Sequence, residues 1–78
     1  MIQFYVVEVQ KYKDGTFGHI VHFAADEDPN KARMKAESKY HEVLSAAAVS
    51  DIPTHGAIMF DSQCFPLLNY CYNHPTQE

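Results

Sequence analysis

Residues 28–50 form the one segment of this chain with helical periodicity, whereas the other apolar runs are typical of β-strands. Asp28 and Pro29 suit the N-cap and the first position of a helix, and Pro53 disfavours helical geometry in the residue before it. A spacing of i, i+4, i+7 and i+8 places one set of apolar residues on a single side of this helix. The predicted buried stripe is Ala32, Ala36, Tyr40, Val43, Leu44 and Ala47.

The first predicted strand adds a second constraint. The run Phe4–Val9 carries apolar residues at both alternating sets of positions, so both faces of the strand are apolar. One helix covers only one face of a sheet, so something else must cover the other. We therefore expect the chain to associate with itself as a dimer or a larger homo-oligomer.

The strand-like runs on either side of the helix predict two hairpins. Residues 1–24 form the first, with a tight primed turn at Asp14 and Gly15, because both central residues of such a turn need a positive φ. Residues 55–74 form the second, and residues 75–78 are expected to be a frayed end. The predicted fold class is α+β, with the order ββαββ and one amphipathic helix on one face of a small antiparallel sheet.

Composition limits the chain to one globular domain, with 78 residues of which 46% are hydrophobic. So small a core usually leaves a net stability of only roughly 3–5 kcal/mol, and such chains tend to need disulfides, metal or oligomerisation. The net charge of −4 argues against binding to duplex nucleic acid. No apolar run is long enough to span a membrane, and the start of the chain does not resemble a signal peptide. We expect a cytoplasmic protein in which Cys64 and Cys71 stay free thiols.

The histidines and cysteines do not form a catalytic or metal-binding pattern. His19 and His22 are three residues apart in a strand and would point to opposite faces, so a shared metal ion is not expected. The chain has no paired metal-ligand motif, no nucleophile elbow and no glycine-rich phosphate loop. We expect no catalytic residue, metal or cofactor. The alternative is histidine-assisted cleavage of a phosphodiester, with His41, His55 or His74 as acid or base.

Aromatic and basic residues offer a surface for binding. Tyr70 and Tyr72 alternate on one face of the last strand, which suits either a subunit interface, the interpretation we favour, or stacking on a planar base. The basic stretch 31–39 suits either a solvated helix surface or contact with a small anionic ligand.

Residues 36–50, followed by Pro53, His55 and the run Ala57–Met59, resemble small proteins encoded by bacteriophages and prophages of gut and soil bacteria. The resemblance covers the second half of the chain. It implies a phage setting, in which small proteins without catalytic motifs commonly act in virion assembly or disarm host defence. One way to disarm host defence is to sequester nucleotide signals inside an oligomer.

These observations lead to the hypothesis of a non-catalytic, oligomeric binding protein that sequesters a small nucleotide immune signal. Its pocket would lie at a subunit boundary, where basic groups meet phosphate and tyrosines stack on a base. The candidate ligand-binding residues are Arg33, Lys39, Tyr40, His41, Tyr70 and Tyr72. The alternative is a virion accessory subunit or an inhibitor that binds a host defence protein.

Overall fold

The computed structural model describes residues 1–74, which form a four-stranded antiparallel sheet and one helix. The elements are β1 (Ile2–Lys11), β2 (Phe17–Asp26), α1 (Pro29–Ala48), β3 (Thr54–Phe60) and β4 (Pro66–Asn73). The strand order is β2-β1-β3-β4, so β2 and β4 are the edge strands. The predicted α+β fold and its ββαββ order are confirmed. The frayed end predicted for residues 75–78 lies outside the described residues.

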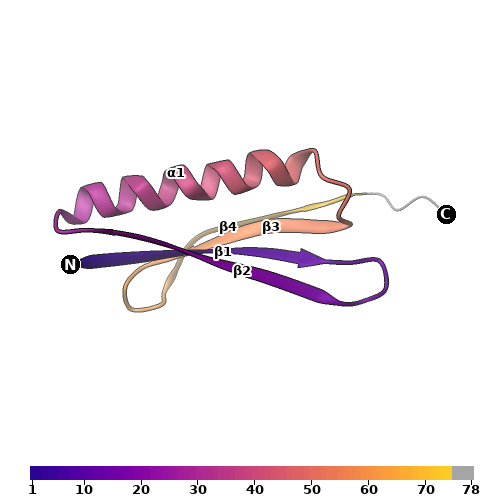
Figure 1. The fold of residues 1–78 in the computed structure, drawn as a ribbon, viewed down its shortest axis with the longest axis horizontal. Coiled ribbons are helices and arrows are strands. Elements are labelled where there is room, and N and C mark those ends of the chain that lie inside the picture. The colour runs from indigo at the N-terminus through magenta and orange to yellow at the C-terminus, as the bar shows by residue number, and fades with distance from the viewer. Residues whose placement is uncertain (75–78) are drawn as a thin grey trace.

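The helix lies along one side of the sheet, and no other element of residues 1–74 lies on the opposite side (Figure 1). We call that opposite side the open face. Directly paired residues of antiparallel strands point to the same side. The pairing of Val6 with Met59 therefore places both side chains toward α1, and Val7 and its partner Ile58 lie on the open face.

The core fills the space between α1 and the sheet. Val6 and Met59 are its largest fully buried side chains. The helix contributes Ala32, Ala36, Tyr40, Val43 and Ala47, all of them buried. Leu44 is only half-buried at the margin of the core, so the predicted stripe is confirmed except at this position.

The turn between β1 and β2 is longer than predicted. The Tyr12 N–H donates to the Thr16 carbonyl at 2.8 Å, and the Gly15 N–H donates to the Tyr12 carbonyl at 3.0 Å. Gly15 has a φ of 90°, but Asp14 is not in the positive-φ region, so the prediction of a primed turn was wrong. The loop has the three-residue pattern that ends in a left-handed glycine. The Asp14 carboxylate stabilises it by accepting hydrogen bonds from the Thr16 N–H and hydroxyl.

The turn between β3 and β4 repeats this hydrogen-bond pattern with a cysteine where the first turn has glycine. The Asp61 N–H donates to the Phe65 carbonyl, and the Cys64 N–H donates to the Asp61 carbonyl, each at 3.0 Å. Cys64 has a φ of 66°. This region costs a residue other than glycine roughly 1–2 kcal/mol, so the turn holds Cys64 under strain.

The start of α1 follows the predicted capping chemistry. Asp28 is the N-cap, and its carboxylate accepts a hydrogen bond from the Asn30 N–H at 2.9 Å, while Pro29 opens the helix. We expect Asp28→Ala to lower the free energy of unfolding by about 1 kcal/mol. Asp28→Asn keeps an acceptor at the same position and should stay within about 0.5 kcal/mol of the wild type. Urea denaturation followed by circular dichroism measures both, and equal losses would contradict the capping role.

Candidate functional site

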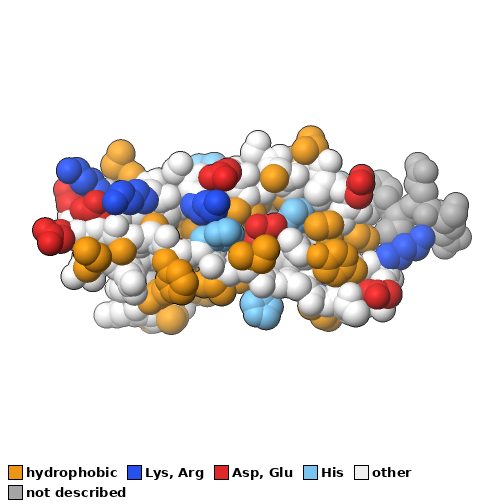
Figure 2. Space-filling view, viewed as in Figure 1, with side chains coloured by type: hydrophobic (Ala, Val, Ile, Leu, Met, Phe, Trp, Pro, Cys, Tyr) orange, Lys and Arg blue, Asp and Glu red, His pale blue; other side chains and the backbone are white. Residues whose placement is uncertain are grey.

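A polar cleft lies between α1 and the edge strand β2, and we call it the α1–β2 cleft. Its volume is about 680 Å³. The helix lines it with Lys35, Ser38, Lys39 and Glu42, and β2 lines it with residues 21–25. Basic, acidic and histidine side chains gather where helix and sheet meet on this side of the molecule (Figure 2).

Two lysines one helical turn apart supply the ammonium groups of the α1–β2 cleft. Lys35 Nζ lies 2.9 Å from Asp26 Oδ2 and 3.3 Å from the Ala25 carbonyl, and Lys39 Nζ lies 3.4 Å from Glu42 Oε1. Exposed pairs of this kind contribute at most about 1 kcal/mol each. A ligand carrying phosphate can therefore compete for both ammonium groups, because phosphate accepts charge-assisted hydrogen bonds.

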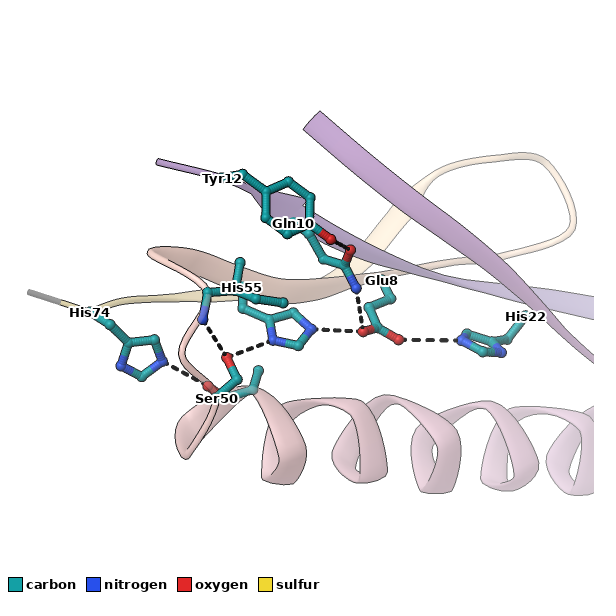
Figure 3. A network of polar contacts seen from close by, with 9 residues as sticks. Glu8, Gln10, Tyr12, His22, Ser50, His55 and His74 are labelled. Atoms are coloured by element: carbon teal, nitrogen blue, oxygen red, sulfur yellow. Dashed lines mark hydrogen bonds and ion pairs between the residues drawn. The ribbon is translucent and has the colours of Figure 1, made fainter. Parts of the chain in front are cut away.

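His22, which lines the α1–β2 cleft, connects it to a polar network under the helix. Glu8 reaches from β1 into this space and lies between two histidines (Figure 3). Its Oε2 is 2.7 Å from His55 Nε2 and 3.0 Å from Gln10 Nε2, and its Oε1 is 3.7 Å from His22 Nε2. Burial alone would raise the pKa of Glu8, but the hydrogen bonds from His55 and Gln10 outweigh it and hold the pKa below its ordinary value. Glu8 is therefore an ionised anchor for its neighbours.

His55 extends this network to the end of the helix. Its Nδ1 lies 2.9 Å from Ser50 Oγ, which also accepts a hydrogen bond from the Ile52 N–H at 3.4 Å. The order hydroxyl, imidazole, carboxylate resembles a hydrolase triad. However, His55 is buried and both of its ring nitrogens are engaged within the fold, and neither Ser50 nor His55 lines the α1–β2 cleft. The network joins the segment after α1 to the sheet and leaves no imidazole nitrogen of His55 for a substrate.

Of the predicted ligand residues, the structure places Lys39 in the α1–β2 cleft. Tyr70 and Tyr72 face the helix side of β4, because their partners Ala57 and His55 are buried there. Since β4 is the edge opposite β2, the structure separates Lys39 from both tyrosines. The subunit interface expected from the sequence placed Tyr70 and Tyr72 on the face that the helix leaves uncovered. In the structure neither tyrosine lies on that open face.

The other three predicted residues lie outside the α1–β2 cleft. Arg33 pairs with Glu37 at 3.2 Å on the exposed surface of the helix. Tyr40 is a core residue, and burial raises the pKa of its hydroxyl, with a smaller contribution from nearby Cys71 and Tyr72. His41 is exposed and contacts Tyr40 edge-on, with ring centroids 5.5 Å apart.

An aromatic row follows the helix side of β4. Tyr70 and Tyr72 meet edge-on at 4.8 Å, and Tyr72 stacks on His74 with an interplanar angle of 11°. His74 donates from Nε2 to the Ala47 carbonyl at 2.7 Å. The row therefore ends at the last turn of α1 and anchors the helix to the edge strand.

The candidate ligand residues chosen from the sequence do not include Lys35, Ser38, His22 or Glu8, although Lys35 lies in the basic stretch 31–39. Lys35 and Lys39 are four residues apart, which already places them on one side of a helix. Glu8 is the carboxylate within the apolar run Phe4–Val9, a position where a charge needs a partner. The prediction that His19 and His22 point to opposite faces is confirmed, since they pair with Val9 and Val6 of β1.

Within residues 1–74, no group of three or more His, Cys, Asp or Glu side chains is arranged to hold a metal ion. No helix in that part of the chain combines the length and apolar character needed to cross a membrane. Comparison with protein-family models, curated proteins and solved structures finds no match to this chain.

Proposed function

We propose that this chain is a non-catalytic, homo-oligomeric binding protein that holds a small nucleotide-like anion in the α1–β2 cleft. The observation that carries the proposal is the placement of Lys35 and Lys39 on one wall of the cleft, with an edge strand as the other wall. The resemblance of the second half of the chain to phage proteins supports sequestration of a nucleotide immune signal in the host cytoplasm as the biological setting.

The chemistry of the α1–β2 cleft matches the parts of a nucleotide. The two ammonium groups suit phosphate, and the Ser38 hydroxyl between them is a further donor. As an edge strand, β2 has backbone N–H and C=O groups on its outer side that do not pair with another strand of residues 1–74. These backbone groups can hydrogen-bond to the polar edge of a base.

Native mass spectrometry with a panel of cyclic and linear nucleotides tests this function. We expect a discrete nucleotide mass in a fixed ratio to the subunits, unchanged over time. Lys39→Gln should weaken binding by about tenfold or more, the effect of removing one charged hydrogen bond. Arg33→Gln is the matched control, because it removes a cation of the same helix and breaks a comparable pair with a glutamate outside the cleft.

Three results would contradict the proposal. Binding of no nucleotide would favour the alternative role as a virion subunit or protein inhibitor, for which the exposed open face offers a surface. Equal weakening in Lys39→Gln and Arg33→Gln would show that the α1–β2 cleft is not the site. Conversion of the bound mass to a product would indicate an enzyme.

A further inference from the structure

The open face of the sheet is largely apolar on β1, β2 and β3. Its strand positions include Tyr5, Val7, Val9, Phe17, Val21, Phe23, Ile58 and Phe60. Phe17 is 75% exposed and Phe23 is 67% exposed. Exposed apolar residues gathered on one face of a small protein are typical of an interaction surface.

The open face combines protruding rings with hollows. One hollow of about 380 Å³ is lined mainly by Val7, Val9, Lys11, Phe17, His19 and Thr54. A second hollow of about 280 Å³ is lined by Tyr5, Val7, Val21, Phe60 and Cys64. Val7 lines both hollows, and the exposed ring of Phe17 lies at the start of β2 while that of Phe23 lies in its second half. A two-fold interface uses the same surface on both copies, so the rings of one copy can enter the hollows of the other.

The charges of the chain also permit two open faces to meet. In spite of the net charge of −4, no acidic residue within residues 1–74 occupies a strand position on the open face. Lys11 supplies a formal charge there, and its ammonium lies 5.5 Å from the centroid of the Phe17 ring. Two copies can therefore meet without burying carboxylates against one another, which would be costly.

The size of the open face is sufficient for a dimer. Strands of up to ten residues at about 3.3 Å per residue, four abreast at about 4.8 Å, give a flat area on the order of 600 Å². Two such faces bury on the order of 1,200 Å², the lower end of the range for specific interfaces. A partner would also add burial to a core of marginal size.

We propose that two copies of this chain pack their open faces together about a two-fold axis, with Phe17 and Phe23 of each copy seated in apolar hollows of the other. The proposed function includes self-association, and this interface assigns the surface responsible for it. The interface does not depend on whether the α1–β2 cleft binds a nucleotide. Val21 and Phe23 border that cleft as well, so the second copy lies beside it.

Light scattering during size-exclusion chromatography of the full chain, without nucleotide, tests the interface. We expect twice the chain mass of 8.9 kDa for the wild type and 8.9 kDa for Phe17→Glu and Phe23→Glu. Both side chains are mostly exposed, so the substitutions leave the fold of one copy intact, which circular dichroism checks. Met34→Glu is the matched control, because Met34 is 66% exposed on the helix, and it should remain a dimer.

The reactivity of Cys64 gives a second readout that needs no substitution. Its thiol is exposed in the single chain and lines a hollow of the open face. Alkylation mapped to Cys64 should be at least about tenfold slower at a concentration that supports the dimer than after dilution into monomer. A wild-type mass of 8.9 kDa, or a dimer that persists in both Phe17→Glu and Phe23→Glu, would overturn the proposed interface. A wild-type dimer that binds no nucleotide in native mass spectrometry would instead contradict only the ligand proposed for the α1–β2 cleft.

Discussion

Replacement of Gly56 by alanine should lower the free energy of unfolding by about 3 kcal/mol or more, a large part of the stability of a domain this small. Gly56 lies in β3 opposite Cys71 of β4. A Cβ atom there would lie 2.5 Å from Cys71 Cα and 2.7 Å from Cys71 Sγ, and closer still to the Tyr70 carbonyl oxygen. Two of these three atoms belong to the backbone, so no change of rotamer relieves the overlap. The strands β3 and β4 would have to separate.

Gly18→Ala is the matched control for this prediction. Gly18 is also a strand glycine, but its Cβ would meet the end of the Gln10 side chain at 3.1 Å, which can move. Alanine also restricts the unfolded chain more than glycine does, so we expect a change within about 0.5 kcal/mol. Urea denaturation followed by circular dichroism compares the two variants. Similar stability in both would mean that β3 and β4 are not held as closely as the structure has them.

The helix was predictable from sequence because its signals are local. Asp28 and Pro29 fix its start through backbone chemistry that involves neighbouring residues only, and Pro53 limits its end. The first turn was less predictable, because Asp14 and Gly15 suit both a two-residue and a three-residue loop. The pairing of Tyr12 with Thr16, together with the Asp14 carboxylate, selects the longer loop. This choice depends on strand register, which a short sequence window does not define.

The side of the sheet to which a strand residue points was the harder question. Alternation predicts that Tyr70 and Tyr72 share a face, but the pairing of β4 with β3 decides which face that is. The pairing of β3 with β4 has a register shift beside Phe60, near the turn that joins the two strands. No local residue pattern in the sequence reveals this shift. The open face was predictable from β1, since its apolar residues occupy both sides, and the structure shows that β2 and β3 extend the same apolar surface.

The polar network depended on contacts between distant segments. Glu8 and His55 are 47 residues apart, and only the placement of β1 beside β3 brings them to 2.7 Å. The sequence offered His55 as an acid or base, but it did not reveal that Glu8 and Ser50 occupy both ring nitrogens. The burial of this histidine between a carboxylate and a hydroxyl favours a structural role.

Glu8→Gln should lower the free energy of unfolding by about 2–3 kcal/mol at neutral pH. Hydrogen bonds to a charged group contribute about 1.5–3 kcal/mol, and the Glu8 carboxylate accepts them from both His55 and Gln10 in a partly buried position. A glutamine there presents one acceptor oxygen and an NH₂ group that faces other donors. Glu37→Gln is the matched control, because its pair with Arg33 is exposed, and it should change stability by less than about 0.5 kcal/mol.

The pH dependence of stability identifies the ionised form of Glu8 as the cause. The pKa of Glu8 is held below its ordinary value of 4.5 in the folded protein, so the unfolded chain takes up the proton first as pH falls. The stabilisation from the carboxylate is complete above the unfolded pKa and is lost as pH falls through the folded one. Urea denaturation between pH 7 and pH 3 should therefore show the difference between wild type and Glu8→Gln shrinking below about pH 4.5. A difference that stays constant to pH 3 would mean that shape rather than charge makes Glu8 important.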